Sequence, residues 1–212
     1  MTRAMTLIVT VAAAILLGGC YVSLHPLVSD EVRVYEPGLV GTWVATGDKD
    51  DTWTFRPAGA KSPTGYDIDI VEDRRTARFS GTLARIDGLL ILEIKPGDNG
   101  AQCALLDEHE WFQMHVIGVH SFMRIGLGGD RLRLHLVDAE WLDAAIAAKR
   151  IAIAHEHLDD DDPHAPGQPD VHSDRDRLLL TAPTSDLQAL VRAHGKAGLF
   201  DEDDPGEFTR RR

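Results

Sequence analysis

The chain has few cysteines, which cross-link small secreted proteins, and fewer basic than acidic residues, although basic residues are the ones that contact nucleic acids. Only two cysteines occur among 212 residues, so at most one internal disulfide could form. Aromatic residues make up 6%, and 22 basic residues stand against 34 acidic ones, giving a net charge of −12. This acidic balance argues against nucleic acid as a partner and against electrostatic adsorption to anionic lipid.

Long hydrophobic runs are also scarce, and the one that matters lies near the N-terminus. Residues 4–17 are apolar except for Thr6 and Thr10, and Arg3 places a positive charge ahead of them. The run has 14 residues, whereas a membrane-spanning helix needs roughly 20. We therefore predict a cleaved signal peptide over residues 1–19 rather than a permanent membrane helix.

The run ends at Leu17-Gly18-Gly19-Cys20, which resembles the lipobox of bacterial lipoproteins. The resemblance implies cleavage before Cys20, a diacylglycerol on its sulfur and an acyl chain such as palmitate on the new N-terminus. Such chains contribute about 0.8 kcal/mol of membrane affinity per buried CH₂. We expect a cell-envelope protein whose membrane partner is reached through lipid on Cys20. Tyr21 after the cysteine favours the outer membrane, facing the periplasm, in a Gram-negative cell. An ordinary secretory signal followed by a cysteine is the alternative.

The predicted mature chain has 193 residues, which suits one domain with a sizeable core. We expect residues 20–38 to form a lipidated tether, residues 39–200 a single β-rich globular domain, and residues 201–212 a charged flexible tail. Cys103 is then the one cysteine left free of lipid, and we interpret it as a buried, inert thiol.

Strand patterns dominate the domain, and helical spacing appears only late. Short β-favouring segments are expected at residues 39–44, 52–55, 66–70, 77–84, 89–94, 111–116, 121–125, 132–136, 151–155 and 178–180. Asp87-Gly88 between two apolar runs is typical of a tight hairpin. Asp138 is expected to cap one helix, and Ser185-Asp186-Leu187-Gln188 matches the capping box of a second. We predict a mainly β (α+β) fold, with an antiparallel sheet curled into a barrel or half-barrel and two short helices.

Near the start of the first strand, Gly41-Thr42-Trp43 resembles the Gly-x-Trp motif of lipocalins and lipocalin-like lipoproteins. The resemblance implies an up-and-down barrel whose tryptophan plugs the closed end. It also implies a cavity at the other end, which binds apolar molecules in many members. Only Gly41 and Trp43 are carried over, as structural residues. The long middle segment and the second helix depart from the family plan.

Histidines and aspartates crowd one segment of the chain. His155, His157, His164 and His172 flank Asp159–Asp162, and imidazole with carboxylate suits Zn²⁺, Cu²⁺ or Ni²⁺. On a strand, His155 and His157 would share a face, and a loop bearing His164 or His172 would complete a site. The alternative is a solvated acidic loop, which the prolines of this segment favour. A divalent metal is the one cofactor that the sequence suggests.

Catalytic signals are weak. The chain has no Gly-x-Ser-x-Gly nucleophile motif and no phosphate-binding glycine loop, so we name no catalytic residue and favour a non-catalytic role. Three functions stay open. The first is a lipid-anchored envelope protein that binds an apolar or amphipathic small molecule inside its barrel. The second is a structural or assembly lipoprotein that acts through envelope protein partners. The third is a metal-binding protein or metal-dependent hydrolase built on the histidine segment.

Overall fold

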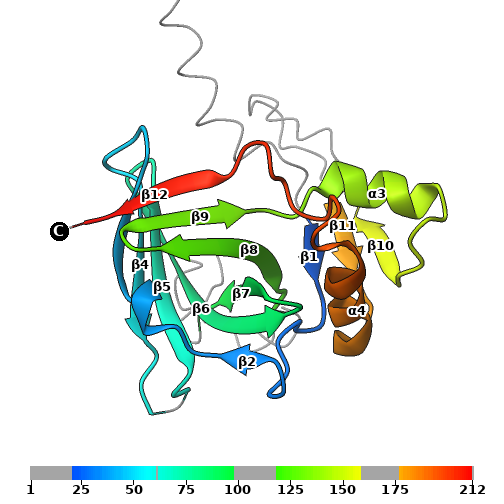
Figure 1. The fold of residues 1–212 in the computed structure, drawn as a ribbon, viewed down its shortest axis with the longest axis horizontal. Helices are drawn as coiled ribbons and strands as arrows, with labels where there is room; N and C mark the ends of the chain where they lie inside the picture. Colours follow the sequence, from blue (N-terminus) through cyan, green and yellow to red (C-terminus); the bar gives the residue numbers. More distant parts are fainter. Residues whose placement is uncertain (1–20, 61, 98–117, 159–176, 212) are drawn as a thin grey trace, which may run out of the picture.

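The computed structural model describes residues 21–60, 62–97, 118–158 and 177–211, and its strands form two β-sheets (Figure 1). The larger sheet has nine strands in the order β2-β6-β5-β4-β3-β12-β9-β8-β7, and β6 also pairs with β7. That additional pairing closes eight of the strands into an antiparallel barrel, which confirms the predicted fold class and decides for a barrel over a half-barrel.

The eight barrel strands are β3 (Gly41–Ala45), β4 (Thr52–Pro57), β5 (Gly65–Glu72), β6 (Arg75–Ile86), β7 (Leu89–Pro96), β8 (Ser121–Gly128), β9 (Arg131–His135) and β12 (Gly206–Arg210). The first seven follow one another around the ring, so their connections alternate between its two ends. The ninth strand of the sheet, β2 (Arg33–Val34), pairs with the far end of β6 at Leu83 and Ala84. A 3-10 helix, η1 (Pro37–Leu39), leads into β3.

Two tight hairpins show how the backbone sets the barrel's register. Asp87 and Gly88 have φ values of 49° and 82°, and Ile86 pairs with Leu89 across them. The expected two-residue turn is therefore present, in the left-handed conformation that matches strand twist. Asp73 and Arg74 make a second such turn, with φ values of 49° and 64°. This second turn has no glycine, and its sequence gives no comparable signal.

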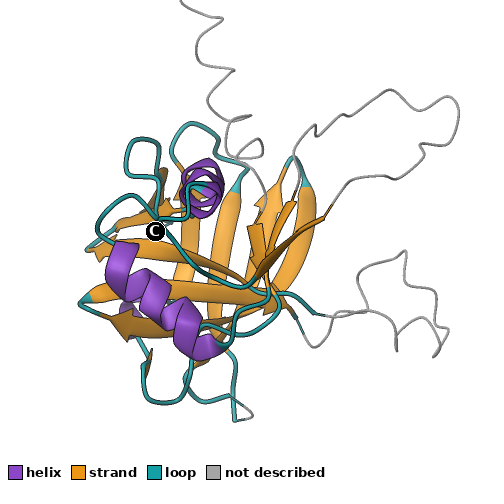
Figure 2. Cartoon of the chain, turned by 90° about the vertical axis from the view of Figure 1, so that its right-hand side faces the viewer, coloured by secondary structure: helices purple, strands orange, loops and turns teal. Residues whose placement is uncertain are grey.

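A smaller sheet lies beside the barrel, in the order β1 (Tyr21–Ser23), β11 (Arg177–Leu180) and β10 (His155–Leu158). The helices α3 (Ala139–Ala147) and α4 (Thr184–His194) lie on the same side of the barrel, and Figure 2 views them from there. All of these elements except β1 belong to the long insertion between β9 and β12. The eight-stranded barrel closes without any strand from this insertion.

Two apolar cores hold the molecule together. The inner core fills the middle of the barrel, where Trp43, Phe55 and Tyr66 are fully buried. The outer core joins the small sheet and both helices to the barrel wall. Its barrel side consists of Ala84, Ile86, Ile91 and Phe122, and its other side includes Leu142, Leu178, Leu187 and Val191. Successive side chains of β6 therefore point into different cores: Leu83 belongs to the inner core and its neighbour Ala84 to the outer core.

The expected tether at residues 20–38 is wrong for the residues that the structure describes. Tyr21 is buried in β1, and its hydroxyl donates to the Phe122 carbonyl and accepts from the Phe122 amide. Leu27 and Val28 are also buried in the outer core. The apolar side chains of this segment pack against the barrel. The polar residues between them are the reason that the sequence pattern does not predict this packing.

The expected flexible tail at residues 201–212 is wrong as well. Residues 206–210 form β12, which pairs with β3 on one side and β9 on the other and so completes the ring. Phe208 supplies the inward apolar side chain, while Glu207 and Thr209 face outward. The alternation of inward and outward side chains extends over only five residues here, and in a highly charged segment this is weak evidence for a strand. The described part of the fold therefore begins at residue 21 and ends at residue 211, outside the expected limits of 39–200 on both sides.

Smaller differences concern helix ends and strand limits. Asp138 caps α3 as expected, because its carboxylate accepts from the Trp141 amide at 2.8 Å. The capping box at Ser185 is absent, since the N-cap of α4 is Pro183, two residues earlier, and it makes no side-chain hydrogen bond. The strand expected at 151–155 lies instead at 155–158. The segment 111–116 and Cys103 lie outside the described residues. Among the described helices, none has the length and hydrophobicity needed to cross a bilayer.

A buried carboxylate fastens the N-terminal segment to the barrel. Glu93 on β7 is 5% exposed, and its side chain accepts from the amides of Leu27 and Val28, the latter at 3.0 Å. His120 Nδ1 lies 3.2 Å from the other carboxylate oxygen, close enough for attraction although no aligned hydrogen bond forms. Glu93 therefore satisfies two backbone donors that burial removes from water.

We predict that Glu93→Ala destabilises the protein by roughly 2–5 kcal/mol, because two buried amides each lose their acceptor. Glu93→Gln keeps one acceptor oxygen and should cost less. Urea unfolding followed by tryptophan fluorescence measures both variants. An alanine variant that unfolds at the same urea concentration as the unmodified protein would show that Glu93 does not hold this segment.

Candidate functional site

One end of the barrel is closed by residues 35–40, which we call the closing segment. Trp43 on β3 donates from Nε1 to the Leu39 carbonyl at 2.8 Å. Arg210 on β12 donates to the carbonyls of Val40, at 2.7 Å, and Gly38. The guanidinium of Arg210 also lies 4.2 Å from the centre of the Trp43 ring. We call this the Trp43 end of the barrel.

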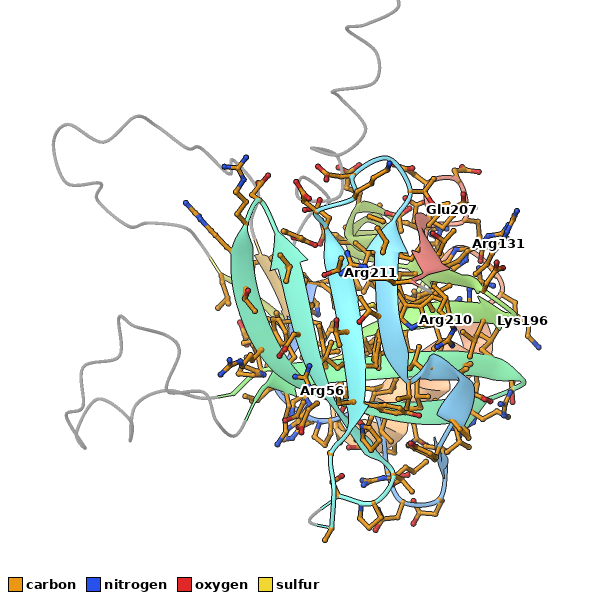
Figure 3. All side chains as sticks on the ribbon, turned by 90° about the vertical axis from the view of Figure 1, so that its left-hand side faces the viewer. Arg56, Arg131, Lys196, Glu207, Arg210 and Arg211 are labelled. Atoms are coloured by element: carbon orange, nitrogen blue, oxygen red, sulfur yellow. The ribbon has the colours of Figure 1, made fainter. Side chains whose placement is uncertain are left out.

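Gly41 makes this arrangement possible. Its φ of +138° is a conformation that residues with a side chain rarely adopt, and a Cβ built there would lie 2.6 Å from Arg210 Nη1. The Gly-x-Trp motif thus has a physical reason in this chain. The glycine admits the arginine, and the arginine stacks on the tryptophan. Arg210 and Arg211 reach this region because β12 runs beside β3 (Figure 3).

Tyr66 holds the closing segment from inside the barrel. Its hydroxyl accepts from the Glu36 amide at 2.8 Å and donates to the Glu36 carbonyl at 3.1 Å. The ring stacks against Tyr35, with ring centres 5.2 Å apart. Burial raises the pKa of Tyr66 to about 12, and the hydrogen bond with Glu36 only partly offsets this effect. The phenol therefore stays protonated throughout the physiological range.

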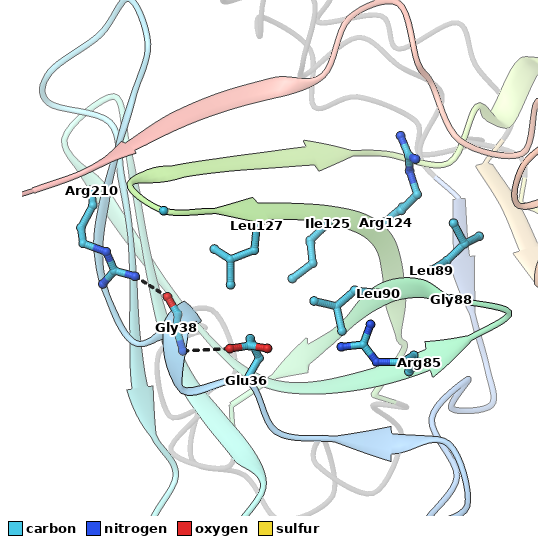
Figure 4. Close-up of a pocket in the computed structure, with 11 residues that line it drawn as sticks. Glu36, Gly38, Arg85, Gly88, Leu89, Leu90, Arg124, Ile125, Leu127 and Arg210 are labelled. Atoms are coloured by element: carbon cyan, nitrogen blue, oxygen red, sulfur yellow. Dashed lines mark hydrogen bonds between the residues drawn. The ribbon is translucent and has the colours of Figure 1, made fainter.

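A cavity of about 630 Å³ lies between the closing segment and the barrel wall. Leu90, Ile125 and Leu127 point into it from β7 and β8, as Figure 4 shows. Gly38 and Glu36 bound it on one side, and Arg85 on β6 on another. The turns at Gly88 and Gly129 complete its rim. Because Gly38, Arg85 and Gly88 are exposed, the cavity opens to solvent.

The cavity differs from the rest of the molecule in its charges. Among the described residues, its lining includes the arginines Arg85, Arg124 and Arg210 but a single carboxylate, Glu36. Arg124 points away in Figure 4 and pairs with Glu202. One Glu36 oxygen accepts from the Gly38 amide at 3.2 Å. An apolar wall beside an exposed guanidinium suits a molecule with an apolar part and a polar head.

The opposite end of the barrel is acidic. The β3–β4 loop and the β5–β6 turn meet there and bring together Asp48, Asp50, Asp51, Glu72 and Asp73. Burial raises the pKa of Glu72, and repulsion from Asp51 and Asp73 raises it further. The pKa of Asp51 is raised by the same kinds of interaction, with burial again first. Carboxylates thus crowd one end, while the cavity with its arginines lies at the other.

The histidine segment is only partly described. His155 and His157 lie on β10, and their ring centres are 5.4 Å apart, so they share a face as the strand pattern predicts. His157 Nε2 is 2.9 Å from an Asp143 carboxylate oxygen, and His155 Nδ1 is 2.9 Å from the Ile153 carbonyl. His164 and His172 lie outside the described residues. Within the described ranges, no three histidine, cysteine or acidic side chains gather closely enough to hold a metal ion.

The structure places in contact residues that lie in segments for which the sequence predicts different roles. Gly41 and Trp43, chosen from the motif, contact Arg210, which lies in the segment expected to be a tail. Arg85, Leu90 and Leu127 had no signal of their own, because alternation along a strand identifies a face but not the cavity it lines. Cys20, the predicted lipid attachment residue, lies just outside the described residues. No protein-family model, no curated protein and no solved structure matches this chain.

We predict that the protein loses stability as pH rises from 10 to about 12. In the unfolded chain the Tyr66 phenol ionises near pH 10, whereas in the folded chain it keeps its proton to about pH 12. The unfolded state then binds fewer protons, so its free energy falls relative to the native state as pH rises. The urea midpoint of unfolding, measured across this window, reports the change.

The matched control is Tyr66→Phe, which has no phenol to ionise. Its urea midpoint should decline less over the same pH range, although burial also raises the pKa of Tyr21 and leaves part of the effect. Identical declines in the two proteins would contradict the assignment to Tyr66.

Proposed function

We propose that this chain is a lipid-anchored cell-envelope protein that binds a small amphipathic molecule in the cavity at the Trp43 end. The cavity carries this proposal. Its volume of about 630 Å³ lies within the roughly 300–1,000 Å³ typical of small-molecule sites. Leu90, Ile125 and Leu127 offer an apolar wall, and Arg85 offers a charged group at the solvent side.

The position of this cavity differs from the position that the lipocalin resemblance implies. In that family the ligand enters at the end opposite the tryptophan. Here large side chains, among them Phe55 and Tyr66, fill the middle of the barrel and are fully buried. The cavity lies at the same end as Trp43, between the barrel wall and the closing segment that Trp43 and Arg210 hold.

The envelope location is supported by the lipobox, Leu17-Gly18-Gly19-Cys20, together with the start of the fold. Tyr21 is the first residue of β1 and is buried in the outer core. Consecutive Cα atoms are about 3.8 Å apart, so a lipid on Cys20 would hold the small sheet close to the bilayer surface. The domain would then be held directly at the membrane rather than on a long tether.

A role through protein partners receives less support. Both helices that could have offered an apolar face use it in the outer core, where Leu142, Ala145, Leu187 and Val191 are buried. What the described residues do offer is β10, an edge strand of the small sheet with exposed side chains. A strand added to that edge by a partner is the second candidate function.

We predict that filling the cavity abolishes ligand binding. Leu127→Trp places a large ring among Leu90, Ile125 and Gly38, and should weaken the binding of twelve-carbon amphiphiles by about tenfold or more, as expected when apolar contact is replaced by overlap. Isothermal titration calorimetry below the micelle concentration measures the affinity. Leu158→Trp, at an exposed position on β10, is the control and should bind like the unmodified protein. Equal affinity in both variants would exclude the cavity as the site.

We predict that the mature protein begins at Cys20 and partitions with membranes. Intact-mass analysis of protein purified from a bacterial envelope should show loss of residues 1–19 and the added mass of the acyl chains. Cys20→Ser removes the sulfur that carries the diacylglycerol, so this variant should appear in the soluble fraction. An unmodified Cys20, or an uncut leader, would contradict the anchor and leave the cavity proposal untouched.

A further inference from the structure

Arg85 is the one arginine of the cavity lining whose side chain bonds to no described residue. Arg124 pairs with Glu202, and Arg210 is engaged by the Val40 and Gly38 carbonyls and by the Trp43 ring. The Arg85 backbone amide donates to Val32 at 2.8 Å, which fixes the residue on its strand. Its guanidinium is left exposed at the cavity (Figure 4).

The apolar wall begins directly beside this guanidinium. Arg85 pairs with Leu90 across β6 and β7, so both side chains leave the sheet on the same face. Leu90 in turn pairs with Ile125 on β8, and Leu127 is the next residue of β8 on that face. A row of apolar side chains therefore extends across the barrel wall from a single cationic group.

The charges of the cavity lining differ from the charge of the whole protein. The chain carries a net charge of −12, and carboxylates gather at the opposite end of the barrel. Among the described residues of the cavity lining, by contrast, three arginines stand against one carboxylate, so an anion is repelled less there than at the acidic end. Glu36, the carboxylate of the lining, already accepts from the Gly38 amide and comes from the closing segment rather than from the β6–β7 wall.

We propose that the cavity recognises a single-chain amphiphile with an anionic head group, and that Arg85 binds that head group. This inference rests on the proposed function and names its ligand class. A phosphate or carboxylate head suits the planar guanidinium, which offers parallel N–H donors to two oxygens. The acyl chain lies along Leu90, Ile125 and Leu127. Glu36 lies on the other side of the cavity and disfavours a second anionic group there.

The test compares head groups on one chain length. Dodecyl phosphate, laurate, dodecyl maltoside and dodecyltrimethylammonium are titrated into the full mature protein by calorimetry, each below its micelle concentration. We expect dodecyl phosphate and laurate to bind about tenfold or more tightly than the neutral and cationic amphiphiles, the size expected for a charge-assisted hydrogen bond. The ratio of phosphate to carboxylate affinity distinguishes a phospholipid-type head from a fatty acid.

Two variants assign the effect to its residue. Arg85→Gln should lower the affinity for dodecyl phosphate by about tenfold and leave the affinity for dodecyl maltoside unchanged. Glu36→Gln removes the carboxylate's charge and should tighten dodecyl phosphate binding. Arg75→Gln is the matched control, because Arg75 is an exposed arginine at the other end of the same strand. It should bind like the unmodified protein.

The two proposals fail in different ways. If dodecyl maltoside binds as tightly as dodecyl phosphate, and Arg85→Gln changes neither affinity, the head-group assignment is overturned while binding in the cavity stands. If none of the four amphiphiles binds the unmodified protein, the proposed function fails and this inference fails with it.

Discussion

The guanidinium of Arg210 lies over the ring of Trp43 and donates to the Val40 and Gly38 carbonyls, and the site depends on this one arrangement. It joins the last strand of the barrel to the first. It also fixes the closing segment, which forms one side of the cavity. A cation over an indole contributes about 0.5–2 kcal/mol, and bonds from a charged donor add more. Without it, the carbonyls would lose their donors and the cavity would lose that side.

The second constraint is the division of the molecule into two cores. A barrel of eight strands holds a filled middle, so its interior leaves room for a ligand only toward an end. The insertion between β9 and β12 then covers the outside of the wall at Ile86, Ile91 and Phe122. These are the strands whose inward side chains, Arg85, Leu90 and Ile125, line the cavity. The outer core therefore packs against the back of the cavity wall.

The sequence was enough for the fold class, because period-two alternation and the turn at Asp87-Gly88 are local signals. It also singled out Gly41 and Trp43, although not their partner. Arg210 lies 167 positions after Trp43, and nothing local marks it as a partner. Charged neighbours made residues 201–212 look like a tail, yet Phe208 and the pairing with β3 and β9 place a strand there. The N-terminal segment likewise depends on distant partners, since the amides of Leu27 and Val28 donate to Glu93, far along the chain. Long-range pairing, rather than local propensity, decides these cases.

Amide hydrogen exchange in the closing segment tests the central claim most directly. The Leu39 and Val40 amides donate to the Glu36 and Pro37 carbonyls, at 3.0 Å and 3.1 Å. If Arg210 holds this segment, Arg210→Ala should speed exchange at both amides by about tenfold or more, while amides of α4, which lies outside the barrel, keep their rates. Unchanged exchange at Leu39 and Val40 would show that the segment stays closed without the arginine and would contradict the account.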